Sequence, residues 1–120
     1  MTKTKSQCIR WNDIPTETLN PLLDRQFVVG EQIMMARITL RKGCLVPEHS
    51  HHHEQVSQVL SGSLQFVVDG KEVLLHAGEL LFLPPHVPHS ALALEDTVAI
   101  DTFTPPREDW INKTDQYLRR

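Results

Sequence analysis

The close, regular spacing of turn signals most limits what this chain can fold into. Short apolar runs end at Gly62, Gly70 and Gly78, and another ends at Pro84. The Asp69-Gly70 pair between two apolar segments is a strong hairpin signal, because both central residues of a tight type I′ turn need a positive φ. Many short strands separated by such turns are typical of an all-β sandwich or barrel.

Alternating side chains support this interpretation. In residues 32–41, Ala36 and Ile38 fall on one face of a strand and Arg37 on the other. Residues 1–20 lack this pattern, so we expect an irregular lead-in there, a barrel at 21–105 and a short C-terminal helix or tail at 106–120. The expected strands are 21–30, 31–41, 55–60, 63–68, 71–76, 80–83, 89–94 and 97–104, and the helical pattern covers 105–119.

Composition excludes several classes of protein. The 120 residues are 40% hydrophobic and 22% charged, which fits one folded domain rather than a disordered chain. The formal net charge is −3, with no basic stripe, so nucleic acid is not an expected partner. No apolar run is long enough for a membrane span, and no secretory signal is recognisable. We therefore expect a cytoplasmic protein with no membrane partner, in which Cys8 and Cys44 are reduced thiols.

Histidines are concentrated in one segment. Four of the seven fall between positions 49 and 53. On a strand, His49 and His51 would project from one face, so their imidazoles would converge. With Gln55 and His89 on neighbouring strands, three imidazoles and one oxygen donor would form a mononuclear site for a divalent metal. The alternative is a set of solvated loop histidines that share no site.

The spacing around these histidines resembles a known family. Gly43 is followed by five residues, His49-x-His51, three residues, Gln55 and, after six more, Gly62. Further along, Gly78 precedes Pro84 by five residues, and four more lead to His89. These patterns resemble the two signature motifs of the cupin superfamily. The resemblance covers about residues 20–112 and implies an antiparallel jelly-roll barrel, or double-stranded β-helix, with a metal inside its mouth. It also implies a homodimer.

Three positions depart from the cupin motifs: Gln55 replaces the usual Glu, His86 a Gly, and Ala93 an Asn. A neutral amide at position 55 leaves the metal one unit more positive than a carboxylate would. That charge favours a Lewis acid or a binder of anionic substrates over a redox iron site. Imidazole and amide ligands suit Zn, Ni, Fe, Mn or Co. His53 competes with Gln55 as a ligand, and His86 is a further candidate for the mouth.

Within the cupins, three strings resemble the KdgF-type proteins of pectin and alginate catabolism: HSHHHEQVSQVLSG, LPPHVPHSALALED and DTFTPPRED. Those proteins linearise 4,5-unsaturated uronate monosaccharides to the open-chain 5-keto-4-deoxyuronate. The resemblance implies an anionic sugar substrate and adds a pattern Asp-x-Phe-x-x-x-Arg, present here as Asp101, Phe103 and Arg107. It also implies that the metal ligands are His49, His51, Gln55 and His89.

Each residue of the Asp-x-Phe-x-x-x-Arg pattern has a chemical role and a structural alternative. Arg107 is the candidate anchor for the uronate carboxylate, because a guanidinium binds a carboxylate bidentately; the alternative is a helix-start cation paired with Glu108 or Asp109. Asp101 is the candidate acid/base, the alternative being an exposed strand residue. Phe103 is a candidate wall for the sugar or part of the core. Arg25 and Arg37 are further candidate contacts for a carboxylate.

The sequence thus favours a metal-dependent cupin enzyme that opens and ketonises unsaturated uronates. Two other hypotheses remain: a non-catalytic cupin that binds sugar acids or other small ligands, and an iron-dependent cupin oxygenase. The metal and the source of the uronate, pectin or alginate, are left open.

Overall fold

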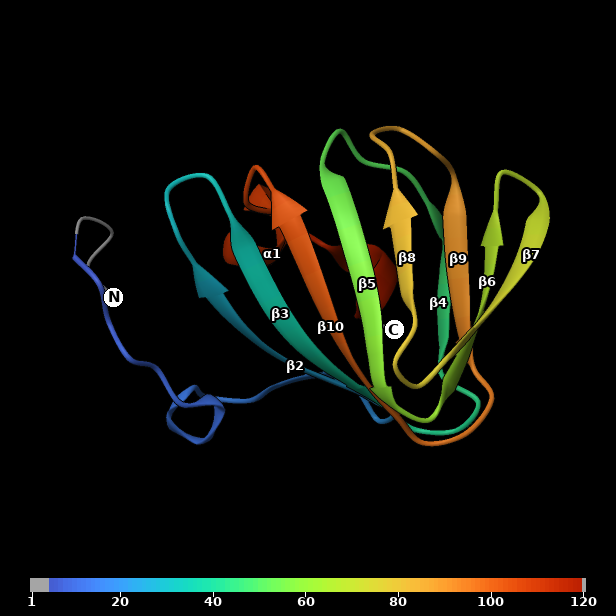
Figure 1. Cartoon of the computed structure of the whole chain (residues 1–120), viewed down its shortest axis with the longest axis horizontal. Coiled ribbons are helices and arrows are strands. Elements are labelled where there is room, and N and C mark those ends of the chain that lie inside the picture. The colour runs from blue at the N-terminus through green and yellow to red at the C-terminus, as the bar shows by residue number, and fades with distance from the viewer. Residues whose placement is uncertain (1–4, 120) are drawn as a thin grey trace.

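The computed structural model describes residues 5–119, so residues 1–4 of the expected lead-in and Arg120 of the expected tail lie outside it. Ten strands form two antiparallel sheets with one apolar core (Figure 1). The all-β jelly-roll prediction is confirmed. The strands are β1 (Glu17–Asn20), β2 (Leu23–Val29), β3 (Met34–Leu40), β4 (Leu45–His49), β5 (Glu54–Ser61), β6 (Ser63–Val68), β7 (Lys71–His76), β8 (Leu80–Leu83), β9 (His89–Ala93) and β10 (Thr97–Thr104).

The strand order brings distant parts of the chain together. The larger sheet runs β1-β2-β3-β10-β5-β8 and the smaller one β4-β9-β6-β7. The late strand β10 lies between β3 and β5, and the late strand β9 lies between β4 and β6 (Figure 1). Consequently β4 and β9 place the two halves of the histidine set side by side, whereas β5 and β10 place Gln55 in the same sheet as Asp101.

The predicted hairpin is confirmed. Val68 and Lys71 pair across the β6–β7 turn, and both central residues have positive φ angles, 50° at Asp69 and 81° at Gly70. This is the backbone that a type I′ turn requires. The faces predicted for β3 are also observed, since Ala36 and Ile38 are buried while Arg37 is on the outer face.

One motif glycine is explained by close packing. Gly62 has a φ of 88°, and a Cβ at this position would overlap the carbonyl oxygen of Asp96 and the side chain of Thr97. A β-carbon at Gly78, which has a similar φ of 87°, would meet no described atom within 4 Å. Both positions need a left-handed backbone, but only Gly62 also needs the missing side chain.

Three local predictions are wrong. The lead-in is not irregular throughout, because β1 (Glu17–Asn20) pairs with β2. The expected strand ranges omit β4 (Leu45–His49), although the predicted convergence of the histidines assumed a strand at His49. The helix predicted over 105–119 is reduced to α1 (Glu108–Ile111) and a 3-10 turn, η2 (Gln116–Leu118). Lys113, with a φ of 58°, ends the helical path.

A buried ion-pair network holds the C-terminal segment on the barrel. Arg25 Nη1 donates to Asp115 Oδ2 at 2.7 Å, and Arg25 Nη2 donates to Glu17 Oε1 at 2.7 Å. Arg119 contacts both carboxylates as well. Both terminal nitrogens of Arg25 are therefore committed to protein carboxylates, and these ion pairs fasten residues 115–119 to β1 and β2. Among the described residues, no helix is long and apolar enough to cross a membrane.

Candidate functional site

Three imidazoles converge where β4 ends and β9 begins. His49 and His89 are register partners, and their ring centroids lie 4.4 Å apart. The His51 ring lies 5.6 Å from that of His49 and 5.1 Å from that of His89. One ring nitrogen of each residue lies within 4.8 Å of the others, a group able to hold a metal ion. The predicted convergence occurs, although His51 lies in the loop after β4 rather than on a strand.

Backbone carbonyls fix the tautomers of two of these histidines. His49 Nδ1 lies 2.8 Å from Pro47 O, and His89 Nδ1 lies 2.9 Å from Val87 O. Because a carbonyl oxygen only accepts, each Nδ1 donates and each Nε2 keeps a lone pair. His89 Nε2 is buried with no hydrogen-bond partner among the described residues. Metal-binding histidines commonly have this arrangement, in which one nitrogen is anchored and the other is free.

Gln55 supplies an oxygen beside the imidazoles. The residue begins the inward-facing part of β5, and its Oε1 lies 3.1 Å from His51 Nε2. An imidazole nitrogen and an amide oxygen this close together could both bind one divalent metal ion. The structure thus brings together all four predicted ligands, and their donor atoms fit a divalent transition metal.

Burial keeps these histidines neutral. It lowers the pKa of His49 to about 4 and that of His51 to about 3, and the Arg107 guanidinium adds to the shift at His51. Burial also lowers the pKa of His89. At neutral pH the rings therefore carry lone pairs rather than second protons.

Asp101 faces the same pocket from β10. It is the register partner of Ser57 on β5, whose hydroxyl donates a 2.6 Å hydrogen bond to Asp101 Oδ1. Burial raises the pKa of Asp101 to about 6, against the opposing effects of the Ser57 hydrogen bond and the Arg107 charge. A carboxyl group with this pKa exchanges protons readily near neutral pH, so the alternative of an ordinary exposed strand residue does not hold.

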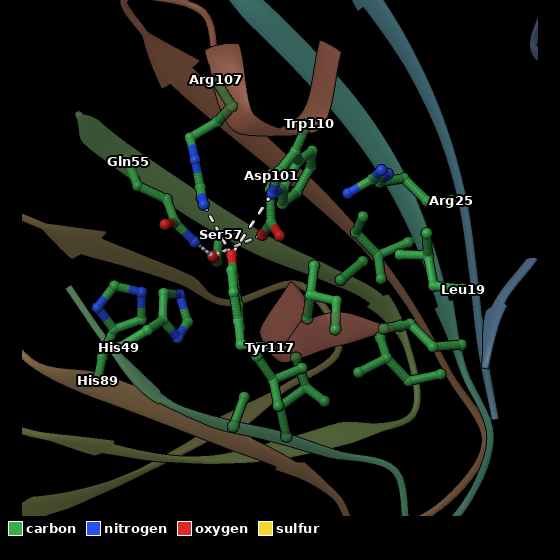
Figure 2. Close-up of a pocket in the computed structure, with 18 of the residues that line it drawn as sticks. Leu19, Arg25, His49, Gln55, Ser57, His89, Asp101, Arg107, Trp110 and Tyr117 are labelled. Carbon is green, nitrogen blue, oxygen red and sulfur yellow. Dashed lines mark hydrogen bonds between the residues drawn. The ribbon is translucent and has the colours of Figure 1, made fainter. Parts of the chain in front are cut away.

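Ser57 was missed by the sequence reasoning. Gln55 Nε2 donates to Ser57 Oγ at 2.9 Å, so the serine joins the amide to Asp101 (Figure 2). The available signal was its position two residues after Gln55, which places both side chains on one face of β5.

Arg107 has both of the predicted environments at once. Its Nε and Nη2 donate to the two carboxylate oxygens of Asp109 at 3.0 and 2.8 Å, the pairing considered as the alternative. The guanidinium also lines the pocket, only 2% exposed, and Nη2 donates to the Tyr117 hydroxyl at 2.7 Å. Its other terminal nitrogen, Nη1, makes no hydrogen bond to any described residue, so it is the nitrogen left for a ligand.

Phe103 is a buried wall of this pocket. It is 1% exposed, and its ring lies 5.9 Å from that of His51 and 5.0 Å from that of Trp110. The Arg107 guanidinium carbon lies 5.1 Å from the Phe103 ring centroid, a cation–π contact. Phe103 is thus core and pocket wall together.

The pocket is the barrel interior. It is lined by side chains of both sheets and is open to solvent at the mouth. Its polar end holds His49, His89, Asp101 and Arg107, and apolar side chains such as Leu19 line the far end, with Arg25 beside them (Figure 2). Residues from the C-terminal segment, Trp110, Tyr117 and Leu118, complete the lining.

Two other candidate histidines are not in this group, although the His53 ring lies only 5.2 Å from that of His51. His53 is buried, but its Nε2 faces Glu108 Oε2 at 3.2 Å, and with His52 these residues form a second group able to hold a metal ion. His86 is exposed and is not among the described residues that line the pocket. Its backbone N–H donates to His51 O at 2.7 Å, so it braces the loop that carries His51.

Comparisons with known proteins agree with this geometry. A family model described as a cupin domain matches residues 36–102, more than half of the chain. The pectin degradation protein KdgF of Dickeya dadantii (strain 3937) is 29% identical over 103 residues, which cover 83% of this chain and 94% of that protein. An H2HPP isomerase of Bacillus subtilis is 29% identical over 100 residues, 80% of this chain but 42% of the isomerase.

The comparison with solved structures also identifies cupins as similar to this chain. An RmlC-like cupin from Shewanella frigidimarina is 34% identical with a TM-score of 0.83, covering 91% of this chain and 99% of its own. KdgF from Halomonas sp. is 25% identical with a TM-score of 0.83, covering 88% of this chain and 99% of its own. The predicted resemblance to KdgF proteins is confirmed. By its matched domain, its barrel and its motif spacing, this chain belongs to the cupin family.

Proposed function

We propose that this cupin is a metal-dependent enzyme that converts 4,5-unsaturated uronate monosaccharides to the linear 5-keto-4-deoxyuronate. The observation that carries the proposal is that three of the proposed metal ligands, His49, Gln55 and His89, line one pocket with Asp101 and Arg107. The fourth, His51, lies against them. The similarity to two KdgF proteins, one of them named for pectin degradation, supports the choice of substrate class.

The reaction is an isomerisation, so its protons must balance. The anomeric hydroxyl loses a proton, the bond between C1 and the ring oxygen breaks, and that oxygen leaves as an enolate. Carbon 4 then gains a proton, which gives the 5-keto group. One group that first accepts a proton and then donates one can serve both steps.

Asp101 is suited to that role. Its pKa of about 6 makes the ionised and protonated forms both accessible near neutral pH. Ser57 holds one carboxylate oxygen in place and leaves the other, Oδ2, without a hydrogen bond to any described residue. Oδ2 is therefore the atom that would accept and return the proton.

Arg107 and Phe103 would position the sugar. The carboxylate of the substrate would bind Arg107 Nη1, because Nε and Nη2 are already held by Asp109 and Tyr117. A divalent metal held by His49, His51, Gln55 and His89 would supply a Lewis acid that stabilises negative charge on oxygen. Phe103 would form an apolar wall beside the sugar.

The test uses unsaturated monouronates prepared separately with pectin and alginate lyases. The metal-loaded protein should remove the ultraviolet absorbance of the conjugated double bond, and Asp101→Asn should keep its metal while losing turnover by a factor of about 10² or more. No loss of absorbance with either substrate would contradict the proposal. Binding without turnover would indicate a sugar-acid binding protein, and oxygen uptake would indicate an oxygenase. The expected homodimer is checked separately by light scattering.

A further inference from the structure

Ser57 lies between a proposed metal ligand and the proposed acid/base. Its hydroxyl donates to Asp101 Oδ1 at 2.6 Å and accepts from Gln55 Nε2 at 2.9 Å (Figure 2). The serine is 0% exposed and Gln55 is 5% exposed. Water therefore has little access to Ser57 and Gln55, so the serine hydroxyl and the Gln55 amide nitrogen depend on each other and on Asp101 for their hydrogen bonds.

The number of available hydrogens determines which group donates and which accepts in the hydrogen bonds that join Gln55, Ser57 and Asp101. A serine hydroxyl has one hydrogen, and an ionised carboxylate can only accept. While Asp101 is ionised, the hydrogen of Ser57 is used on Asp101, so the serine offers residue 55 only lone pairs. An N–H donor must face it, and the Gln55 amide nitrogen does. The amide oxygen is then turned the other way, to within 3.1 Å of His51 Nε2.

We propose that Ser57 is the positioning residue that requires an amide at position 55 and aims its oxygen at the metal. The inference rests on the metal centre of the proposed function and not on the uronate chemistry. It gives a physical reason for the departure of this chain from the cupin motif, in which the position of Gln55 is usually Glu.

A carboxylate at position 55 would meet two opposing effects. Its charge would attract a divalent cation more strongly than the Gln55 amide does, and charge alone predicts that Gln55→Glu holds or improves metal binding. Its inner oxygen, however, would lie against the lone pairs of Ser57. Two buried carboxylates would then compete for one hydroxyl hydrogen, which is destabilising. Removing the hydroxyl should remove only the second effect.

The experiment is a double-mutant cycle on metal-free protein, with Zn²⁺ affinity measured by competition calorimetry. Ser57→Ala should weaken Zn²⁺ binding about tenfold, the lower end of the effect of residues that orient a ligand. The change in affinity caused by Gln55→Glu should be at least about tenfold more favourable in the Ser57→Ala background than in the parent. Ser57→Thr, which keeps the hydroxyl, should bind Zn²⁺ as the parent does.

The matched control is Ser63→Ala. Ser63 is also a buried strand serine whose hydroxyl donates to a carboxylate, Glu95 Oε2 at 2.9 Å, but it lies outside the pocket lining. The Ser63→Ala substitution should leave the Zn²⁺ affinity unchanged. Circular dichroism should show that every variant is folded. Equal effects of Gln55→Glu in both backgrounds, or full affinity in Gln55→Ala, would overturn the proposal. Because this experiment measures Zn²⁺ affinity and not turnover, a failure of the protein to convert uronates would not contradict the role proposed for Ser57.

Discussion

The phenol ring of Tyr117 stacks on the imidazole of His49, with ring centroids 4.5 Å apart and planes inclined by 29°. The same tyrosine accepts a hydrogen bond from Arg107 through its hydroxyl. One side chain from the C-terminal segment therefore touches both the proposed metal centre and the proposed carboxylate anchor.

Tyr117→Phe should separate these two contacts. The ring remains to stack on His49, so metal content should stay at the parental level. Arg107 Nη2 loses one acceptor, and we expect KM for the uronate to rise about tenfold, equivalent to about 1.4 kcal/mol. Steady-state kinetics and metal analysis on the same preparation test this. A parallel loss of metal would show that the hydroxyl, rather than the ring, supports the centre.

The proposed ligands predict a sharp contrast between neighbouring histidines. His49→Ala, His51→Ala and His89→Ala should each reduce tightly bound metal to near zero, because each removes one of three converging nitrogens. His52→Ala should retain it, since that side chain is exposed and faces Glu108. Elemental analysis after gel filtration gives the answer. Full metal content in the His51→Ala variant would contradict the proposed set of metal ligands.

Arg107 should discriminate between charged and neutral ligands. Arg107→Ala should weaken binding of the uronate by about 1.5–3 kcal/mol, the scale of a charge-assisted hydrogen bond, and binding of its neutral amide far less. Arg107→Lys should recover only part of the loss. Arg41→Ala, at an exposed arginine paired with Asp24, is the control and should bind both ligands normally. Calorimetry with equal losses for the two ligands would make Arg107 purely structural.

The raised pKa of Asp101 has a consequence for stability. The pKa is about 6 in the folded protein and near 3.8 when unfolded, so the fold binds this proton more tightly. Protonation therefore favours folding, and stability is lost as the pH rises from 3.8 to about 6, above which the cost of the buried carboxylate is constant. In metal-free protein Asp101→Asn should be about 1–3 kcal/mol more stable relative to the parent at pH 8 than at pH 4. Urea unfolding at the two pH values measures this, and a pH-independent difference would contradict it.

The two turn glycines allow a matched test of packing. Gly78→Ala should cost only about 1–2 kcal/mol, the price of a left-handed backbone for a residue with a Cβ. Gly62→Ala adds an overlap with backbone atoms of the Asp96–Thr97 turn and should cost about 3 kcal/mol or more. Thermal unfolding of the two variants under one set of conditions compares them. Equal destabilisation would show that the Asp96–Thr97 turn shifts at little cost to make room for the added Cβ.

Sequence reasoning succeeded where the information is local or tied to a motif. The Asp69-Gly70 turn and the inward face of β3 follow from backbone sterics and strand periodicity. The motif spacing, and the strand pairing that it implies, correctly predicted that His49 and His89 lie side by side. The i, i+2 argument correctly predicted that His51 lies beside His49, but its premise was wrong, because His51 lies beyond the end of β4 and not on a strand.

The remainder depends on contacts between distant residues. Tyr117 could not be predicted as part of the site, since its place depends on η2 packing against β4. Arg25 resembled a candidate for substrate binding until its partner Asp115, 90 positions away, was located. The overestimated helix at 105–119 has the same origin, because Arg25 and Asp115 hold that segment in an irregular path that helix propensity alone does not foresee.

The network of Arg25, Glu17 and Asp115 also links one edge of the larger sheet to the pocket. Glu17 lies on the edge strand β1 and Arg25 on its neighbour β2, whereas Tyr117 follows Asp115 by two residues and stacks on His49. Loosening the Arg25–Asp115 pair would therefore loosen Tyr117 as well. A substitution at the sheet edge would then be felt at the ring of His49.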